Sequence, residues 1–356
     1  MKVALLGDIA LFGLFSKSNK NIFDYLKPIK TVLAGCDFVV ANLETPLTSH
    51  TKPYGAKSAY ISSLPENVEI LKYLGINNVN LANNHLFDFG KKAFEDTKEI
   101  LTNYSIEYFG VVGKHSFIEK KGNRIALEGF CCYSTNPLGL GKSGINALNY
   151  KVVEGVLNKN RVMGYNTILS IHAGQEHINY PNYDHIKFAR KLSEISSYVY
   201  YGHHPHVLQG IEHYNNSLIA YSLGNFCFDD VYTKQSDKPL VRQSENNKSS
   251  IILELEYQNN RLVNYKTISI YAGENKMEIG NNRILNNLKK YSLKLAMDES
   301  DYKNMRNKIL AEIKNKRTSQ HDFNWYIKRM NIRTLFIIKD LLVNKIKYKI
   351  NFKNYL

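Results

Sequence analysis

The feature that most constrains the fold is a recurring unit in which a short apolar run ends in polar residues and a helical pattern follows. Apolar runs rich in strand formers occupy residues 2–6, 38–41, 78–82, 167–171 and 198–201. Helical patterns occupy residues 20–34, 62–74, 89–104 and 183–195, the first with a break expected near Pro28. Because strands that alternate with helices are typical of α/β proteins, the chain is predicted to form an α/β sheet.

Polar clusters follow these strands at the points where the strands end. They are Asp8, Asn42 with Glu44, Asn83 to His85 with Asp88, His172 with Glu176, and His203, His204 and His206. The carboxyl ends of strands in an α/β sheet converge on one rim, where ligands bind. Carboxylates, amides and imidazoles without cysteine exclude a zinc finger or an iron–sulfur centre and suit a pair of Mn, Fe or Zn-class ions. We therefore expect a metal site at this rim.

The densest of these clusters is the segment GHHPHVLQ at residues 202–209. Pro205 disfavours a helical conformation for His204 and favours an extended one. In an extended segment the side chains of His204 and His206 lie on the same side of the chain. Because imidazole is the commonest metal ligand in proteins, the pair is a candidate metal clamp. A histidine-rich surface loop without a metal, or a pair of hydrogen-bonded structural histidines, stays open as the alternative.

The motifs taken together resemble those of a known family. They are GD at 7–8, NLE at 42–44, ANNHLFDFG at 82–90, HAGQEH at 172–177, GHHPHVLQ at 202–209 and SLGNFCFD at 222–229. This series is similar to that of the bacterial capsule-synthesis CapA/PgsA family, a branch of the calcineurin-like metallophosphoesterases, and covers about residues 1–270. The resemblance implies an α/β fold of four layers, an α-β-β-α metallophosphoesterase sandwich in which two sheets pack face to face with helices outside.

The resemblance also implies roles for individual residues. Two divalent metal ions of the Mn, Fe or Zn class would be held by Asp8 and His206, by the bridging Glu44, and by Asn84, His172 and His204. His85 would assist the leaving group, with Asp88 as its orienting partner. Contacts with substrate or with the ligands would come from Asn42, Glu176, His203 and Asn225, and His203 could replace His204 as the ligand.

Several of these residues have a purely structural alternative. Asp8 and Asp88 could each cap a helix. Glu44 could be a solvated turn residue, and Asn225 could belong to a tight turn after Gly224. Asn83 is expected to be a turn former beside Asn84.

The sequence departs from the wider superfamily at two positions. Ala10 stands where generic metallophosphoesterases have a histidine two residues after the first aspartate, so the first metal is expected to be held weakly. Ala173 replaces a tryptophan of many relatives and should widen the pocket. Many relatives also carry an N-terminal membrane anchor, which we do not expect here.

The positive charge is concentrated at the C-terminus. The net charge is +15, and residues 276–356 hold 19 Lys or Arg against 7 Asp or Glu. We therefore divide the chain into a metallophosphoesterase domain at 1–275 and a basic, mainly helical extension at 276–356, with helical patterns at 281–317 and 325–349. Three uses of the extension stay open: a helix packed on the main domain, a contact with an anionic membrane face, and a contact with a synthase complex.

The remaining segments have weaker signals. Residues 218–223, 250–256 and 262–271 are predicted strands, the last two an antiparallel pair, and residues 232–249 are predicted to form a mobile surface loop. The four cysteines lack metal-ligand spacing and no signal sequence precedes the first strand, which favours free thiols and a cytoplasmic protein, with peripheral contact at the inner membrane face as an option.

The function expected from these observations is metal-dependent phosphoester hydrolysis in capsule or cell-surface polysaccharide biosynthesis. A metal-activated hydroxide would be the nucleophile, and a phosphorylated sugar or polysaccharide precursor the substrate. The alternative is an accessory subunit of a poly-γ-glutamate or polysaccharide synthesis and export complex, with a metal site for binding or amide chemistry. A nucleic-acid partner is not expected, because no stacking-aromatic module accompanies the basic tail.

Overall fold

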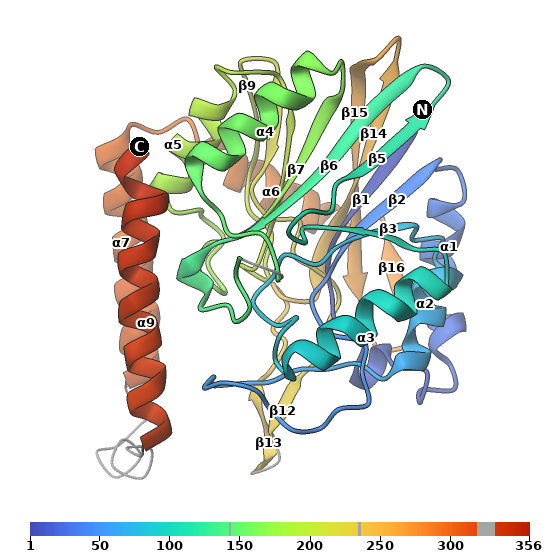
Figure 1. The fold of residues 1–356 in the computed structure, drawn as a ribbon, viewed down its shortest axis with the longest axis vertical. Helices are drawn as coiled ribbons and strands as arrows, with labels where there is room; N and C mark the ends of the chain where they lie inside the picture. Colours follow the sequence, from blue (N-terminus) through green and yellow to red (C-terminus); the bar gives the residue numbers. More distant parts are fainter. Residues whose placement is uncertain (142–143, 234–235, 319–331) are drawn as a thin grey trace.

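Two large β-sheets lie face to face at the centre of the molecule, with helices on the outer side of each (Figure 1). The computed structural model describes residues 1–141, 144–233, 236–318 and 332–356. The predicted four-layer α-β-β-α arrangement is therefore confirmed.

The first sheet combines a parallel half with an antiparallel half. Its strand order is β16-β15-β14-β1-β2-β3-β4, and β11 also pairs with β1. The strands are β1 Lys2–Ile9, β2 Phe38–Leu43, β3 Asn78–Asn80, β4 Glu107–Phe109, β11 Asn225–Cys227, β14 Ser249–Gln258, β15 Arg261–Ala272 and β16 Met277–Ile279. Strands β1 to β4 and β11 are parallel, whereas β14, β15 and β16 pair antiparallel. The carboxyl ends of the parallel strands therefore lie along one edge.

The second sheet is mainly parallel, in the order β5-β6-β7-β8-β10-β9. Its strands are β5 Ser116–Lys120, β6 Asn123–Cys131, β7 Asn166–His172, β8 Val199–His203, β9 Ile211–Tyr214 and β10 Ser217–Ala220. The core strands β6, β7, β8 and β10 run parallel to one another.

Side chains alternate along β1, so this one strand contributes to two hydrophobic cores. Val3 and Leu5 point into the core between the sheets, whereas Ala4 and Leu6 point into the core beneath the outer helices. All four are fully buried, as expected for a strand covered on both faces. Each fully buried Val or Leu contributes roughly 1.5–3 kcal/mol relative to its exposed state.

The helices cover the outer faces of the sheets. The first sheet is covered by α1 Ile22–Leu33, α2 Val68–Tyr73 and α3 Gly90–Asn103, and the second by α4 Tyr150–Val162 and α5 Tyr183–Leu192. Short 3₁₀ turns are η1 Gly13–Phe15, η2 Pro65–Asn67, η3 Tyr133–Thr135 and η4 Lys353–Tyr355. In α1 the buried residues Ile22, Leu26, Ile29 and Leu33 recur at helical spacing, which fixes the face that packs on the sheet.

The C-terminal residues are largely helical in the described part of the chain. They form α6 Asn282–Lys294, α7 Glu299–Thr318 and α9 Ile332–Asn351. Tyr302 and Phe352 are fully buried in the core outside the second sheet, so these helices pack on the main body. Residues 325–331 of the predicted helix lie outside the described residues. Strand β16 extends the first sheet past residue 275, and the division of the chain there stays a prediction.

Two expectations about local structure are wrong, those for Pro28 and for residues 232–249, and the helix predicted at 62–74 is confirmed in part. Pro28 lies inside a continuous α1, whose helix it does not break. The predicted helix at 62–74 begins with the 3₁₀ turn η2, and α2 proper starts at Val68 without a side-chain cap. Residues 232–249, predicted as a loop, contain most of a hairpin made of β12 Val231–Thr233 and β13 Ser236–Val241. Its side chains include the exposed Tyr232 and Leu240, which explains the missing core pattern.

Two long elements, strand β6 and helix α4, were not predicted from the sequence. Strand β6 is the longest strand of the second sheet, and α4 follows it. Arg124, Glu128 and Gly129 interrupt the apolar pattern of β6, although Glu128 and Gly129 are buried. All four cysteines are free thiols, as expected. Within the described part of the chain, no helix has the length and apolar character needed to cross a membrane.

Candidate metal centre

The predicted polar clusters converge from both sheets on one place at the carboxyl ends of the parallel strands. Asp8 of β1 is in register with Asn42 of β2, and His172 of β7 is in register with His203 of β8. Glu44 follows β2 directly. The two sheets therefore present their strand ends to a common centre, as the α/β arrangement predicts.

Two glycines of the motifs are required by close backbone contacts. A Cβ atom on Gly7 would lie 2.0 Å from the carbonyl oxygen of Gly224, and one on Gly202 would lie 1.9 Å from that of Tyr221. Side chains cannot be accommodated at such distances, so the strand ends that carry Asp8 and His203 need glycine before them.

Asp8 connects strands of both sheets through its carboxylate. Its Oδ1 accepts a hydrogen bond from Asn42 Nδ2 at 2.9 Å and lies 2.9 Å from His203 Nδ1, while Oδ2 accepts from the backbone N–H of His204 at 3.2 Å. Burial raises the pKa of Asp8, but the hydrogen bond and charge of His203 and the charge of His206 outweigh it and lower the pKa below its usual range. Asp8 caps no helix, because it lies inside β1.

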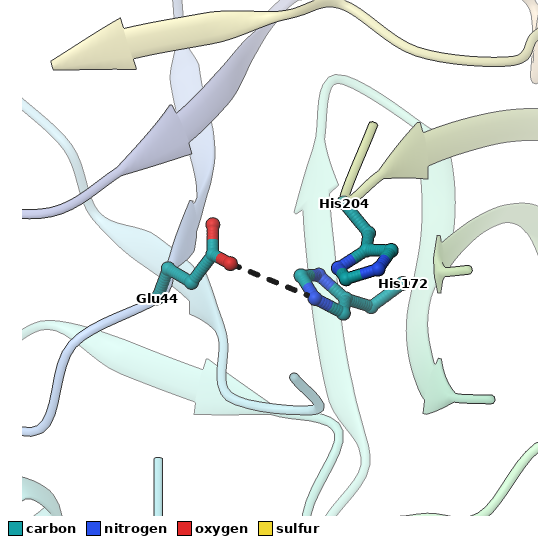
Figure 2. A group of neighbouring side chains, drawn as sticks. All are labelled: Glu44, His172 and His204. Atoms are coloured by element: carbon teal, nitrogen blue, oxygen red, sulfur yellow. Dashed lines mark ion pairs between the residues drawn. The ribbon is translucent and has the colours of Figure 1, made fainter. Parts of the chain in front are cut away.

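Glu44 is fully buried and lies at the middle of the site. Neither of its carboxylate oxygens has a hydrogen-bond partner among the residues that the structure describes. Its Oε1 lies 3.7 Å from His172 Nε2 and 3.6 Å from His206 Nε2 (Figure 2 shows the first pair). Burial, followed by the charges of Asp8 and Glu176, holds the pKa of Glu44 well above its usual range. A solvated turn position is therefore excluded for this residue.

The donor atoms around Glu44 suit a divalent cation. Three overlapping groups have their donor atoms within 4.8 Å of one another: Glu44 with His172 and His204, Asp8 with Glu44 and His206, and Glu176 with His204 and His206. A buried carboxylate without partners is costly unless a positive charge compensates it. Imidazole and carboxylate donors in this arrangement fit Mn, Fe or Zn-class ions.

The backbone of the histidine loop, residues 202–209, does not have the extended conformation expected at His204. His204 is not extended, since its φ is +90°, and His206 adopts a left-handed conformation with φ of +57°. Positive φ is strained for residues other than glycine and persists where the surroundings fix it. Here the backbone N–H of His204 is held by Asp8, and the carbonyl of His206 accepts from Asn247 Nδ2 at 2.9 Å. The two rings nevertheless lie close, with centroids 5.8 Å apart.

The three histidines of the loop occupy different positions. His203 uses Nδ1 for Asp8 and places its ring edge-on to Tyr201, with centroids 4.1 Å apart. His204 and His206 instead belong to the donor groups around Glu44, so the geometry favours His204 over His203 as the second ligand of the loop. Burial lowers the pKa of His204 to about 3, partly offset by Glu176, which keeps its ring neutral as a metal ligand must be.

Asn225 holds His206 in place. Its Oδ1 lies 2.9 Å from His206 Nδ1, and its Nδ2 donates to Gln243 Oε1 at 2.9 Å. With Nδ1 committed to Asn225, the Nε2 atom of His206 is left toward Glu44. Orientation of a ligating histidine by a hydrogen bond to its other nitrogen is the usual arrangement around metals. Gln243 was not identified from the sequence, because it lies in the segment predicted as a loop.

Three asparagines, one at the end of β2 and two after β3, have distinct contacts. Asn84 Oδ1 lies 2.8 Å from His172 Nε2, at the edge of the donor group. Asn42 Nδ2 lies 3.4 Å from His172 Nδ1 and so links His172 to Asp8. Asn83 turns away, donates to the carbonyl of Leu43 and accepts from the backbone N–H of His85 and Leu86. Asn83 is therefore the expected turn former.

A second charged group adjoins the centre. His85 Nδ1 lies 2.7 Å from Asp88 Oδ2, and Lys57 Nζ lies 2.5 Å from Asp88 Oδ1 and 3.2 Å from His85 Nδ1. Asp88 does not cap α3, whose N-cap residue is Phe89. Lys57 was missed in the sequence, because a single lysine in a polar segment carries no pattern. Burial, with the charge of Lys57, lowers the pKa of His85, and Asp88 opposes this.

A cavity of about 1000 Å³ opens onto the centre. Its polar wall includes Asn84, His85, Glu176, His204 and His206, and its apolar wall includes Phe228, Leu240, Ile313, Ile337 and Leu341. Glu176, which joins one of the donor groups, is exposed to this cavity. Ala10 packs in a small apolar cluster with Ile61, Phe228 and Val231.

The family comparison agrees with the motif series. The family described as bacterial capsule synthesis protein PGA_cap matches residues 2–230. The PGA biosynthesis protein CapA of Bacillus subtilis (strain 168) is 30% identical over 258 residues, which cover 68% of this chain and 67% of that protein. The capsule biosynthesis protein CapA of Bacillus anthracis is 28% identical over 273 residues, covering 72% and 66%. The matched region spans about two thirds of the length of these relatives.

Solved structures give a weaker similarity. A 5'-nucleotidase precursor from Thermus thermophilus aligns with 83% of this chain and 58% of its own, at 14% identity and a TM-score of 0.42. A similarity of this size carries no argument about activity.

Proposed function

Because the chain belongs to the PGA_cap family of bacterial capsule synthesis proteins, we propose that it is a metal-dependent phosphoester hydrolase of capsule or cell-surface polysaccharide biosynthesis. The observation that carries the proposal is Glu44, a buried carboxylate without a protein hydrogen-bond partner that is surrounded by His172, His204 and His206. We infer that Glu44 would serve as a common ligand for two divalent ions of the Mn, Fe or Zn class.

Each metal would have its own set of residues. Asp8 and His206 would hold the first ion, and His172, His204 and Asn84 the second. Bound divalent ions lower the pKa of coordinated water toward neutrality and neutralise charge on phosphoryl oxygens. The residues around the ligands keep them oriented: Asn42 holds Asp8, and Asn225 holds His206.

His85 is the candidate for the proton that the leaving oxygen needs. It lines the cavity and is oriented by Asp88, so that its Nδ1 is committed and Nε2 is available to a substrate. A neutral imidazole cannot donate through Nε2 while Nδ1 carries the proton, so this role requires an imidazolium. The negative charge of a bound phosphoester would favour that form over the neutral one.

Turnover of phosphoesters tests the proposal. Purified protein with added Mn²⁺ or Zn²⁺ is offered a panel of sugar phosphates, nucleotides and phosphodiesters. We expect hydrolysis of at least one class, and a loss of about 10²–10⁴-fold in His85→Ala with metal content unchanged, as for general-acid residues. A matched control is His213→Ala, because His213 lies in β9, outside the donor groups. Equal activity in the wild type and His85→Ala would contradict the role of His85.

The second candidate function is an accessory subunit of a poly-γ-glutamate or polysaccharide synthesis complex. It is favoured by the name of the B. subtilis relative, a PGA biosynthesis protein. In that case the metal centre would serve binding or amide chemistry. Stoichiometric metal binding combined with no turnover across the phosphoester panel would support this candidate over the first.

A further inference from the structure

Helix α9 carries an apolar surface that faces away from the rest of the protein. Leu335, Leu342, Ile346 and Ile350 recur at helical spacing, and their exposed fractions are 67%, 58%, 60% and 56%. We call these four residues the outer face of α9. Figure 1 places α9 at the edge of the molecule, apart from both sheets. Isolated exposed apolar residues are ordinary, but several on one side of a helix indicate an interaction site.

The exposure of the outer face does not come from a detached helix. The opposite side of α9 is bound to the body, since Asn344 Nδ2 donates to Asn136 Oδ1 and Asn149 Nδ2 donates to Asn351 Oδ1, both at 2.8 Å. Phe352, directly after the helix, is fully buried against Phe188. The outer face is therefore held in a fixed orientation toward solvent.

Lysines border this apolar row. Lys339 lies within it, and Lys345, Lys347 and Lys349 are exposed along its sides. Asp340 is the one acidic residue in the α9 sequence, and it is only partly exposed. An apolar stripe flanked by lysines is the pattern of helices that lie in the interface of an anionic membrane, where apolar burial and attraction to lipid headgroups add.

We propose that the outer face of α9 docks on an anionic lipid surface. Charge decides between this partner and a second copy of the chain. In a symmetric contact the same lysines would face one another and repel, whereas anionic headgroups would neutralise them. A mode in which the helix spans the bilayer is excluded by its lysines, so α9 lies on the surface.

Docking in this way would bring the metal centre to the membrane. Ile337 and Leu341 of α9 line the same cavity as His85 and His204. One helix would thus face lipid on one side and the cavity on the other. The lipid contact itself needs no metal, so it is tested separately from the proposed hydrolysis.

Co-sedimentation of the full chain with vesicles tests the proposal. We use vesicles of phosphatidylcholine and phosphatidylglycerol in equal amounts, and vesicles of phosphatidylcholine alone, in the absence of added metal. We expect binding to the anionic vesicles that is weakened by salt. The double variant Leu342→Glu, Ile346→Glu should lower the partition coefficient by at least about tenfold, because each charge opposes insertion at the interface.

The matched control is Val162→Glu, which puts a charge at another apolar position on a helix end, 78% exposed. It should bind vesicles like the wild type, and thermal melts should give all three proteins the same midpoint. Equal vesicle binding by the double variant and the wild type would overturn the proposal. So would the absence of vesicle binding in the wild type, or light scattering that shows a dimer dissociated by the double variant.

Discussion

Glu44 is the residue on which the chemistry of the centre depends. Its two oxygens face three imidazoles in a space closed to solvent, and its pKa is raised by burial and by neighbouring carboxylates. Because it has no hydrogen-bond partner among the described residues, this carboxylate is costly to bury as an anion. A bound cation would supply the missing positive charge and reverse the shift in pKa.

Replacement of Glu44 by glutamine should therefore change metal-dependent stability more than intrinsic stability. With Mn²⁺ at about 100 times the Kd of each of the two proposed sites, the wild type should gain about 5 kcal/mol, which corresponds to a rise in Tm of roughly 7 °C. Glu44→Gln should lose most of this rise while its metal-free Tm stays within about 2 °C. Glu128→Gln, a second buried glutamate, should keep the full rise. Equal Mn²⁺-dependent shifts in all three proteins, measured by scanning calorimetry, would contradict the bridging role.

The contact between Lys57 and Asp88 makes a separate prediction. Both side chains are buried, with exposed fractions of 6% and 0%, so removal of one partner strands a charge. Lys57→Met alone should lower the free energy of unfolding by about 3–5 kcal/mol. The double variant Lys57→Met, Asp88→Asn should be more stable than the sum of the single changes predicts. Urea denaturation of the wild type, Lys57→Met, Asp88→Asn and the double variant measures this coupling. Strictly additive changes in the free energy of unfolding would contradict it.

At the residue level, the sequence identified most of the centre because its residues follow strand ends. Asp8, Glu44, Asn84, His172, His204 and His206 all lie together as the motif series implied, and their roles as metal ligands stay a prediction. Lys57 and Gln243 could not be predicted. Their side chains reach the centre from segments whose own residues show neither period nor motif, so only the tertiary fold brings them there.

At the level of single elements, close packing at the strand ends contrasts with open space on helix surfaces. A Cβ atom on Gly202 of β8 would lie 1.9 Å from the carbonyl oxygen of Tyr221, whereas one on Gly155 in α4 would have no described atom within 4 Å apart from its chain neighbours and its own helix backbone. Gly202→Ala should destabilise the protein by more than about 2 kcal/mol because backbone must move. Gly155→Ala should stabilise it by about 0.5–1 kcal/mol. Chemical denaturation measures the change in the free energy of unfolding for each variant, and the two changes should have opposite signs. Equal changes in both variants would contradict the contrast between the two glycines.

The contact of α5 with the C-terminal helix should be weakened by acid. His185 is buried against Phe352, at 5.1 Å between ring centroids, and neither ring nitrogen has a hydrogen-bond partner among the described residues. Burial lowers the pKa of His185 to about 4, with Asp184 opposing and Arg306 adding. Between about pH 6.5 and 4 the unfolded chain binds a proton that the folded chain resists, so stability falls as pH decreases through this window.

Thermal or urea unfolding at pH 7 and pH 5 measures this effect. The wild type should lose about 2 kcal/mol more than His185→Phe between the two values. The difference between the two proteins isolates His185 from the carboxylates that begin to titrate in the same range. An identical acid response in both would show that His185 is not responsible.

The elements that were predicted correctly share a simple sequence pattern. Strands β1 and β2 contain continuous apolar runs ended by polar residues, and β7 has a similar run interrupted by Ser170. Helix α3 is a 14-residue amphipathic helix, so its apolar period and its ends agree. The hairpin of β12 and β13 stands at the rim of the cavity with exposed side chains, and its strands therefore lack the apolar signal. Strand propensity alone does not identify strands that bury so few side chains.

At the scale of the whole molecule, the two sheets and the C-terminal helices meet at one cavity. The sheets supply the polar donors, and α7 and α9 supply the apolar wall with Ile313, Ile337 and Leu341. The sequence placed the positive charge in the C-terminal extension but could not decide between packing on the body and contact with a membrane. The structure shows packing on one side of α9, which leaves the lysine-bordered outer face for a partner.

The central claim is that Glu44 and the surrounding histidines hold two divalent ions. The most direct test is the metal content of the purified chain after incubation with Mn²⁺ and removal of free ion, measured by plasma mass spectrometry. We predict about two Mn per chain for the wild type and for Glu128→Gln, and fewer than about one for Glu44→Gln, because a bridging carboxylate serves both ions. A wild-type chain that retains no metal, or a Glu44→Gln chain that retains as much as the wild type, would contradict the claim.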